Sequence, residues 1–190
     1  MELRKWALAV MTFIGIVVIL YLAIFHPRFR PITPQDIREL SERLALNFSE
    51  RSLIEAVLVT ASQVKHPRIR KALLEIHSLL KSPHTRKQFD ELLADYPEVF
   101  PYEFTLAVDY GGVLGKADIV LKELSHKWPD EPEKRKEVVR EILKPLALQT
   151  LEDKHWFYRS YALYVLAMLK CKEAIPKNFA LASRPRPSRS

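Results

Sequence analysis

The stretch VDYGGVLGKADIVLKEL, residues Val108 to Leu124, contains three of the four glycines of the chain. Glycine serves where a backbone turns through positive φ or lies close to another group. The lysine after Gly115 allows a second interpretation, a phosphate-binding loop. However, Tyr110 stands where that loop needs its first glycine, and Ala117 stands where it needs a hydroxyl. The stretch therefore predicts a tight turn between two helices, with Gly111 capping the first helix at positive φ and Gly115 allowing close helix approach.

The residues around this turn predict an all-α protein. Apolar residues recur every three or four positions from residue 37 to residue 124, which is typical of amphipathic helices. The signals for helix starts are Thr33 with Pro34, Ser52 with Glu55, Pro67, and Thr85 with Gln88. Together with the helices before and after the glycines, these signals predict an antiparallel six-helix bundle of short, closely connected helices.

The first thirty residues contain an apolar segment. WALAVMTFIGIVVILYLAIF, Trp6 to Phe25, has no charged residue and as a helix would be about 30 Å long, enough to cross a bilayer. It is longer than the apolar core of a signal peptide, and HPRFR follows where a cleavage site would need small residues. We expect a retained transmembrane helix, and the basic residues after it favour a cytoplasmic location for the following domain.

These features predict the organisation of the whole chain. The expected parts are a tail (1–5), a transmembrane helix (6–25), a linker (26–33), a helical bundle (34–150), an aromatic-rich helix (151–175) and a basic tail rich in Pro, Ser and Arg (176–190). The net charge of +7 favours an acidic partner such as lipid headgroups. Basic residues alternate with acidic ones and no recognition motif occurs, so we do not expect nucleic acid binding.

No pattern in the sequence predicts an enzyme, a cofactor site or a metal site. The histidines are scattered without ligand spacing, and the one cysteine, Cys171, has no Cys-x-x-Cys partner. Asp90, Glu91 and Asp95 either hold a cation between subunits or, as the composition favours, form a solvated acidic face. Asp109 and Asp118 flank the glycines without a paired base or nucleophile. The sequence therefore predicts a non-catalytic protein.

The aromatic-rich helix carries large side chains, most of them amphipathic rings: Trp156, Phe157, Tyr161, Tyr164, Val165 and Met168. Two interpretations remain open. These side chains either pack in the core or form a surface for the membrane interface or a partner helix. Trp156, Tyr161 and Tyr164 are the candidate residues of such a surface.

The order of these motifs resembles the cytoplasmic domain of the type II secretion system protein F family, which includes the inner-membrane platform proteins of type IV pilus machines. In that family a Pro-x-x-Phe-Pro element precedes a helix that ends in Gly-Glu-x-Ser-Gly-x-Leu. The matching residues here are Pro97, Phe100, Pro101, Gly111 and Gly115. KRKEVVREILKPLAL, residues 134–148, resembles the basic helix that leads into the second membrane span of the family. The resemblance covers about residues 35–148.

The chain also departs from the family. Gly112, Leu114 and Lys144 replace the glutamate, serine and tyrosine of its motifs, and no second apolar span or second domain copy follows. The resemblance implies a scaffold in the bacterial inner membrane, in a type II secretion or type IV pilus machine. Its implied partners are the assembly ATPase, other platform proteins, membrane lipid and a second copy of the chain. The alternative is a membrane-tethered adaptor or regulator outside such a machine.

Overall fold

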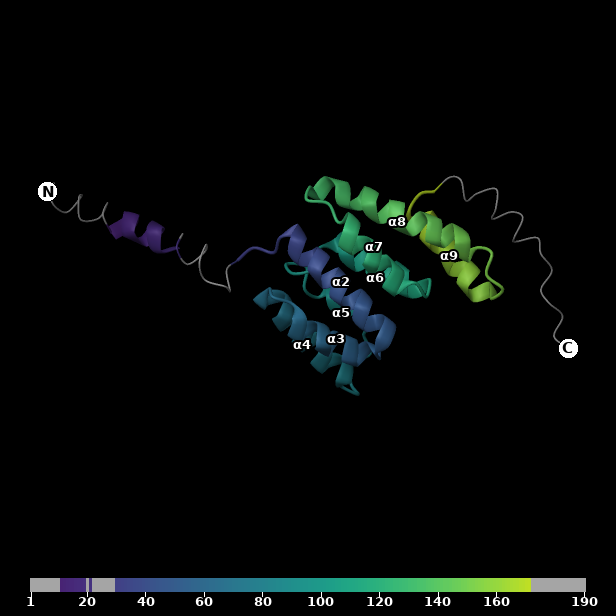
Figure 1. Cartoon of the computed structure of the whole chain (residues 1–190), viewed down its shortest axis with the longest axis horizontal. Helices are drawn as coiled ribbons and strands as arrows, with labels where there is room; N and C mark the ends of the chain where they lie inside the picture. Colours follow the sequence, from purple (N-terminus) through teal and green to yellow (C-terminus); the bar gives the residue numbers. More distant parts are fainter. Residues whose placement is uncertain (1–10, 20, 22–29, 172–190) are drawn as a thin grey trace.

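A computed structural model of the chain describes residues 11–19, 21 and 30–171. Every regular element among these residues is a helix, which confirms the predicted all-α class. Residues 11–19 are helical, and the elements that follow are α2 (Pro34–Glu50), α3 (Leu53–Gln63), α4 (Pro67–Lys81), α5 (Phe89–Ala94), α6 (Tyr102–Val113), α7 (Ala117–Lys127), the 3₁₀ turn η1 (Pro132–Lys134), α8 (Arg135–Thr150) and α9 (Trp156–Met168) (Figure 1).

The predicted transmembrane helix, Trp6 to Phe25, lies partly outside the described residues, as do half of the linker and the whole basic tail 176–190. Residues 11–19 of the span are helical and their side chains are exposed. Among the described residues, none of the helices is both long enough and apolar enough to cross a membrane. The span and its orientation therefore stay predictions.

Two of the predicted helix starts are confirmed in atomic detail. At the start of α2, the Thr33 amide donates to the Asp36 carboxylate at 2.8 Å, and the Asp36 amide donates to the Thr33 hydroxyl at 3.3 Å. At the start of α3, the Glu55 amide donates to the Ser52 hydroxyl at 3.5 Å. These bonds satisfy backbone N–H groups that have no partner within the helix.

The predicted start of the fourth helix is wrong by one turn. Thr85 lies outside α5, and Gln88 is the N-cap residue. The Glu91 carboxylate accepts a hydrogen bond from the Gln88 amide at 3.0 Å. The Glu91 carboxylate can accept this bond from the N-cap amide, and its negative charge is stabilised by the positive end of the helix dipole. In the predicted pair of Thr85 with Gln88, the second residue has no charge.

The helices from α2 to α7 correspond to the six predicted helices, with the start of α5 displaced by one turn. Helix α2 packs against both α3 and α7, and α6 packs against α5 and α7. Buried side-chain hydrogen bonds join α2 to α3. The side-chain amide of Asn47 donates to the Thr60 hydroxyl at 3.0 Å and to the side-chain oxygen Oε1 of Gln63 at 3.1 Å. Asn47 belongs to the sequence pattern of a glycosylation acceptor, but its side chain is buried between α2 and α3.

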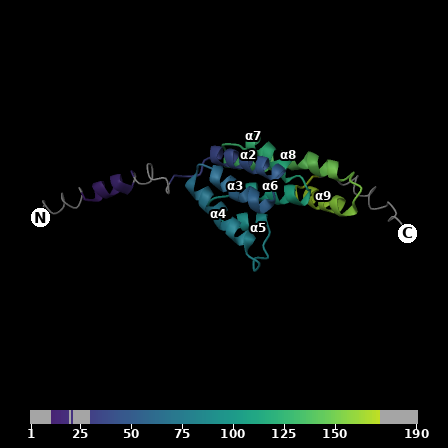
Figure 2. The ribbon, with the colours of Figure 1, turned by 60° about the horizontal axis from the view of Figure 1, so that its bottom comes forward.

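Helices α8 and α9 share the core of the other helices. Figures 1 and 2 show them side by side, at the end of the body away from α3, α4 and α5. Leu143 of α8 and Val165 and Leu166 of α9 belong to the same buried apolar cluster as Leu40 of α2 and Phe104 of α6. Among the described residues, the helices α2 to α7 therefore do not form a bundle separate from α8 and α9.

Candidate functional site

The glycine turn between α6 and α7 closes as a Schellman motif around Gly115. Gly115 has a φ of +66°, the left-handed conformation that glycine adopts without steric cost. The Lys116 amide donates to the Gly111 carbonyl at 2.7 Å, and the Gly115 amide donates to the Gly112 carbonyl at 2.9 Å. These are the two hydrogen bonds that define the motif at a helix C-terminus.

The two glycines have the reverse of the roles that the sequence predicts. Gly111 lies within α6 and has no positive φ. A Cβ atom at Gly111 would lie 3.0 Å from Cγ2 of Val120 and 3.2 Å from Cα of Ala117, so Gly111 is the residue that allows α6 and α7 to approach. The prediction failed because any glycine can end a helix at positive φ. Only the length of α6 decides which of the two glycines follows its last turn.

The backbone of the turn is not arranged to bind phosphate. A phosphate loop presents free N–H groups to its ligand. Here the amides of Leu114, Gly115 and Lys116 all donate to carbonyls of the preceding turn of α6. The structure thus supports the interpretation of these glycines as a connection between helices.

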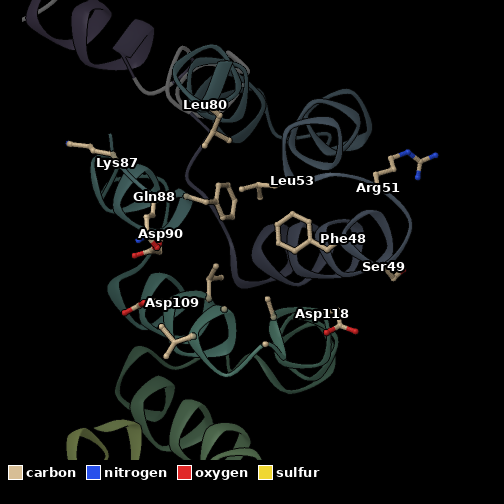
Figure 3. A pocket seen from close by; sticks show the side chains of 16 residues that line it. Phe48, Ser49, Arg51, Leu53, Leu80, Lys87, Gln88, Asp90, Asp109 and Asp118 are labelled. Atoms are coloured by element: carbon tan, nitrogen blue, oxygen red, sulfur yellow. The ribbon is translucent and has the colours of Figure 1, made fainter. Parts of the chain in front are cut away.

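A groove opens beside this turn. It has a volume of about 720 Å³ and is formed by the end of α2, the start of α3, the end of α4, the start of α5 and the α6–α7 turn (Figure 3). Its apolar lining comes from Phe48, Leu53, Leu80, Phe89, Val108 and Val113. The rings of Phe48 and Phe89 meet edge to face with centroids 5.7 Å apart, and Leu53 is 41% exposed. No pattern in the sequence predicted this groove.

The rim of the groove carries five charged side chains. Lys87 already forms an ion pair with Asp95 at 2.6 Å, and Arg51 forms one with Glu50 at 2.9 Å. Asp90, Asp109 and Asp118 also line the groove, and none of them is paired with a basic group among the described residues. We call this feature the acidic groove.

Asp109 lies close to two other carboxylates at this rim. Partial burial raises the pKa of its carboxyl, and the nearby carboxylates of Asp90 and Glu91 raise it further. Figure 3 shows Asp90 and Asp109 on one side of the groove and Asp118 on the other, with the carboxylates of Asp109 and Asp118 directed outward from the apolar side chains. The groove thus combines an apolar centre with a negatively charged edge.

Two of the acidic residues at α5 make local contacts. Asp95 is paired with Lys87, and Glu91 caps the helix. Among the described residues, no group of three or more His, Cys, Asp and Glu side chains is placed to hold a metal ion. His66 is buried, with Nε2 3.1 Å from the carbonyl oxygen of Arg30, and Cys171 is a buried free thiol.

The Pro-x-x-Phe-Pro element positions α6 in the core. Pro101 is the N-cap residue of α6, and the Phe100 side chain is fully buried. The ring centroid of Phe104 lies 6.1 Å from that of Phe100 and 6.3 Å from that of Trp128 at the end of α7. Pro97, the first residue of the element, lies in the turn after α5. The contact of Phe104 with Trp128 joins the start of α6 to the end of α7, at the opposite end of this helix pair from the glycine turn.

Most of the aromatic side chains of α9 lie on the surface and not in the core. Its buried face consists of Ala162, Val165 and Leu166. The large side chains lie mainly on the surface, with exposed fractions of 71% for Trp156, 48% for Phe157, 52% for Tyr164 and 54% for Met168, and Tyr161 is half-buried. We call Trp156, Phe157, Tyr161, Tyr164 and Met168 the aromatic stripe.

The aromatic stripe has a fixed geometry. The Phe157 and Tyr161 rings meet edge to face with centroids 4.5 Å apart. Tyr164 contacts the buried Tyr110 of α6, with ring centroids 6.1 Å apart. Burial, and then the neighbouring Tyr164, raise the pKa of Tyr110 to about 12, so its hydroxyl stays protonated at neutral pH. The stripe therefore presents a preformed surface of aromatic rings.

No protein-family model matches the sequence, and no curated protein or solved structure is significantly similar to it.

Proposed function

We propose that the chain is a non-catalytic, membrane-anchored scaffold of a type II secretion or type IV pilus assembly machine in the bacterial inner membrane. In this proposal the helices from α2 to α7 form the cytoplasmic bundle of the protein F kind, held on the transmembrane helix Trp6 to Phe25. The bundle couples a cytoplasmic assembly ATPase to the inner-membrane platform. A rigid helical body on a membrane stalk can transmit a displacement from a motor without any chemistry of its own.

The observation that carries this proposal is the exposed aromatic stripe of α9. Monomeric soluble proteins rarely expose contiguous apolar patches of several large side chains, and such patches mark surfaces for partners or membranes. Trp and Tyr are enriched at both kinds of surface because their rings are apolar and their edges form hydrogen bonds. Lys154, Arg159 and Lys170 are close to the stripe in the sequence and add positive charge to this part of the chain, which suits anionic headgroups or an acidic partner.

The assignment to a secretion or pilus machine has a separate support, the ordered series of motifs from Pro97 to Pro145. The buried positions of Phe100 and Gly111 are compatible with a shared fold but do not require it. A second candidate function, a membrane-tethered adaptor or regulator outside such a machine, uses the same aromatic stripe and differs only in its partners.

A pull-down of the full chain from detergent-solubilised bacterial membranes tests the proposal and separates the two functions. The scaffold function predicts recovery of the assembly ATPase and of platform proteins. Recovery of neither would favour the adaptor. Protease treatment of spheroplasts tests the location independently: the domain from residue 33 onward should stay intact, and its digestion would overturn the cytoplasmic assignment.

A further inference from the structure

The acidic groove is separate from the aromatic stripe in its position and in its chemistry. It lies between α2, α3, α4, α5 and the glycine turn, whereas the stripe lies on α9. Its centre is apolar and partly open to solvent, as the 41% exposure of Leu53 shows. A volume of about 720 Å³ is within the range of sites that take a ligand or several side chains of a partner.

The charges of the groove define what it can bind. Its two cations, Lys87 and Arg51, are already paired with Asp95 and Glu50. The carboxylates of Asp90, Asp109 and Asp118 have no basic partner among the described residues, in a protein whose net charge is +7. Phosphate groups of nucleic acids or anionic lipids would be repelled by this edge. A ligand with apolar and positively charged groups would be attracted.

We propose that the acidic groove binds a basic, apolar peptide segment of a partner protein, with large apolar side chains between Lys or Arg residues. The apolar side chains would lie against Phe48, Leu53 and Phe89. The basic side chains on one flank would reach Asp90 and Asp109, and those on the other flank would reach Asp118. This inference rests on the proposed scaffold function, because it describes how such a scaffold holds a partner.

Gly112 offers a way to close the groove without disturbing the fold. It lines the groove, and a Cβ atom at this position would meet nothing within 4 Å. A Gly112→Leu variant would place a side chain beside the apolar centre at a helical position where leucine is favoured over glycine. It should therefore fold at least as well as the wild type and bind the segment less well.

The test measures binding of a fluorescent ten-residue peptide that carries Leu and Phe between two Lys-Arg pairs. The full chain is reconstituted in zwitterionic nanodiscs, and empty nanodiscs correct for partitioning into lipid. Fluorescence anisotropy should show saturable binding that weakens as salt is added. Asp90→Asn, Asp109→Asn and Asp118→Asn should each weaken it about two- to fivefold, as expected for exposed ion pairs. Gly112→Leu should weaken it further.

Matched controls make the result specific. Glu137→Gln, an exposed carboxylate on α8 outside the groove, should leave binding unchanged. A peptide with Glu in place of Lys and Arg, and one with Ser in place of Leu and Phe, should not bind. Equal binding by the wild type, the three Asn variants and Gly112→Leu would overturn the proposal, as would the absence of binding.

Two further outcomes concern the identity of the occupant and the scaffold function. A chain that ends at Cys171 tests residues 172–190, which carry five Lys and Arg residues and one Glu. Much tighter peptide binding by this shorter chain would assign the groove to the chain's own segment and overturn the assignment to a partner. Groove-dependent peptide binding together with a pull-down that lacks the ATPase and platform proteins would retain the groove and reject only the machine.

Discussion

The clearest test of the helix packing is to place the same side chain at two adjacent glycines of α6. At Gly111 the Cβ of valine would lie 3.0 Å from Val120 Cγ2, 3.1 Å from Val120 Cβ and 3.2 Å from the Cα of Ala117. The last two atoms belong to the stem of a side chain and to the backbone, so α7 itself must move. At Gly112 the same Cβ would meet nothing within 4 Å.

We expect these two substitutions to differ widely in stability. Overpacking of this kind costs about 1–3 kcal/mol, and in a chain of this size each kcal/mol lowers the melting temperature by about 2–4 °C. Gly111→Val should therefore lower the melting temperature by about 2–12 °C. Gly112→Val should be nearly neutral, because valine and glycine differ by only a few tenths of a kcal/mol in exposed helical positions.

Circular dichroism at 222 nm, on the full chain in detergent, measures both melting temperatures. Gly115→Ala completes the series through a different mechanism, since at a φ of +66° a Cβ atom clashes with the local backbone at a cost of roughly 1–2 kcal/mol, although it would come no closer than 3.9 Å to another residue. Equal melting temperatures for Gly111→Val and Gly112→Val would refute the reasoning, as would a larger loss for Gly112→Val.

The remaining predictions concern charge, the core and the lysine of the turn. Because the folded-state pKa of Asp109 is raised, its ionised form destabilises the fold, and this loss of stability appears as pH rises through that pKa. Asp109→Asn should therefore raise the melting temperature near pH 7, with a gain that shrinks toward about pH 4; a gain that grows on acidification would contradict the assigned cause. Phe104→Ala should cost about 3–5 kcal/mol in urea unfolding, because the ring is fully buried, and a loss below about 1 kcal/mol would show that this contact is poorly described. Lys116→Ala should leave the melting temperature unchanged with or without ATP; stabilisation of the wild type by ATP that this variant abolishes would show that the turn binds phosphate.

Local sequence signals predicted much of the fold. The spacing of Ile37, Leu40 and Leu44 placed the buried face of α2, and all three are fully buried. Thr33 and Ser52 predicted the starts of α2 and α3, because a hydroxyl before a helix has a defined bond to make with the backbone. Such signals act over three or four residues, and they held at these two helices, whereas the pair of Thr85 with Gln88 misplaced the start of α5 by one turn.

Features that depend on how helices meet were harder to predict. The roles of Gly111 and Gly115 depend on where α6 ends, and the sequence does not fix that residue. The acidic groove brings together Phe48, Leu53 and Asp109 from three helices, and no spacing in the sequence connects them. The aromatic stripe was found by composition, but its exposure depends on which face of α9 packs on α8 and α6.

Site-specific photo-crosslinking in living bacteria tests the central claim most directly. A photoreactive phenylalanine analogue replaces Trp156 or Tyr164 in the aromatic stripe, and Lys122, an exposed residue of α7, serves as the control position. The scaffold account predicts crosslinks from the two stripe positions to an assembly ATPase, an inner-membrane platform protein or membrane lipid, and none from Lys122. The absence of products from the stripe, or the same products from Lys122, would contradict it.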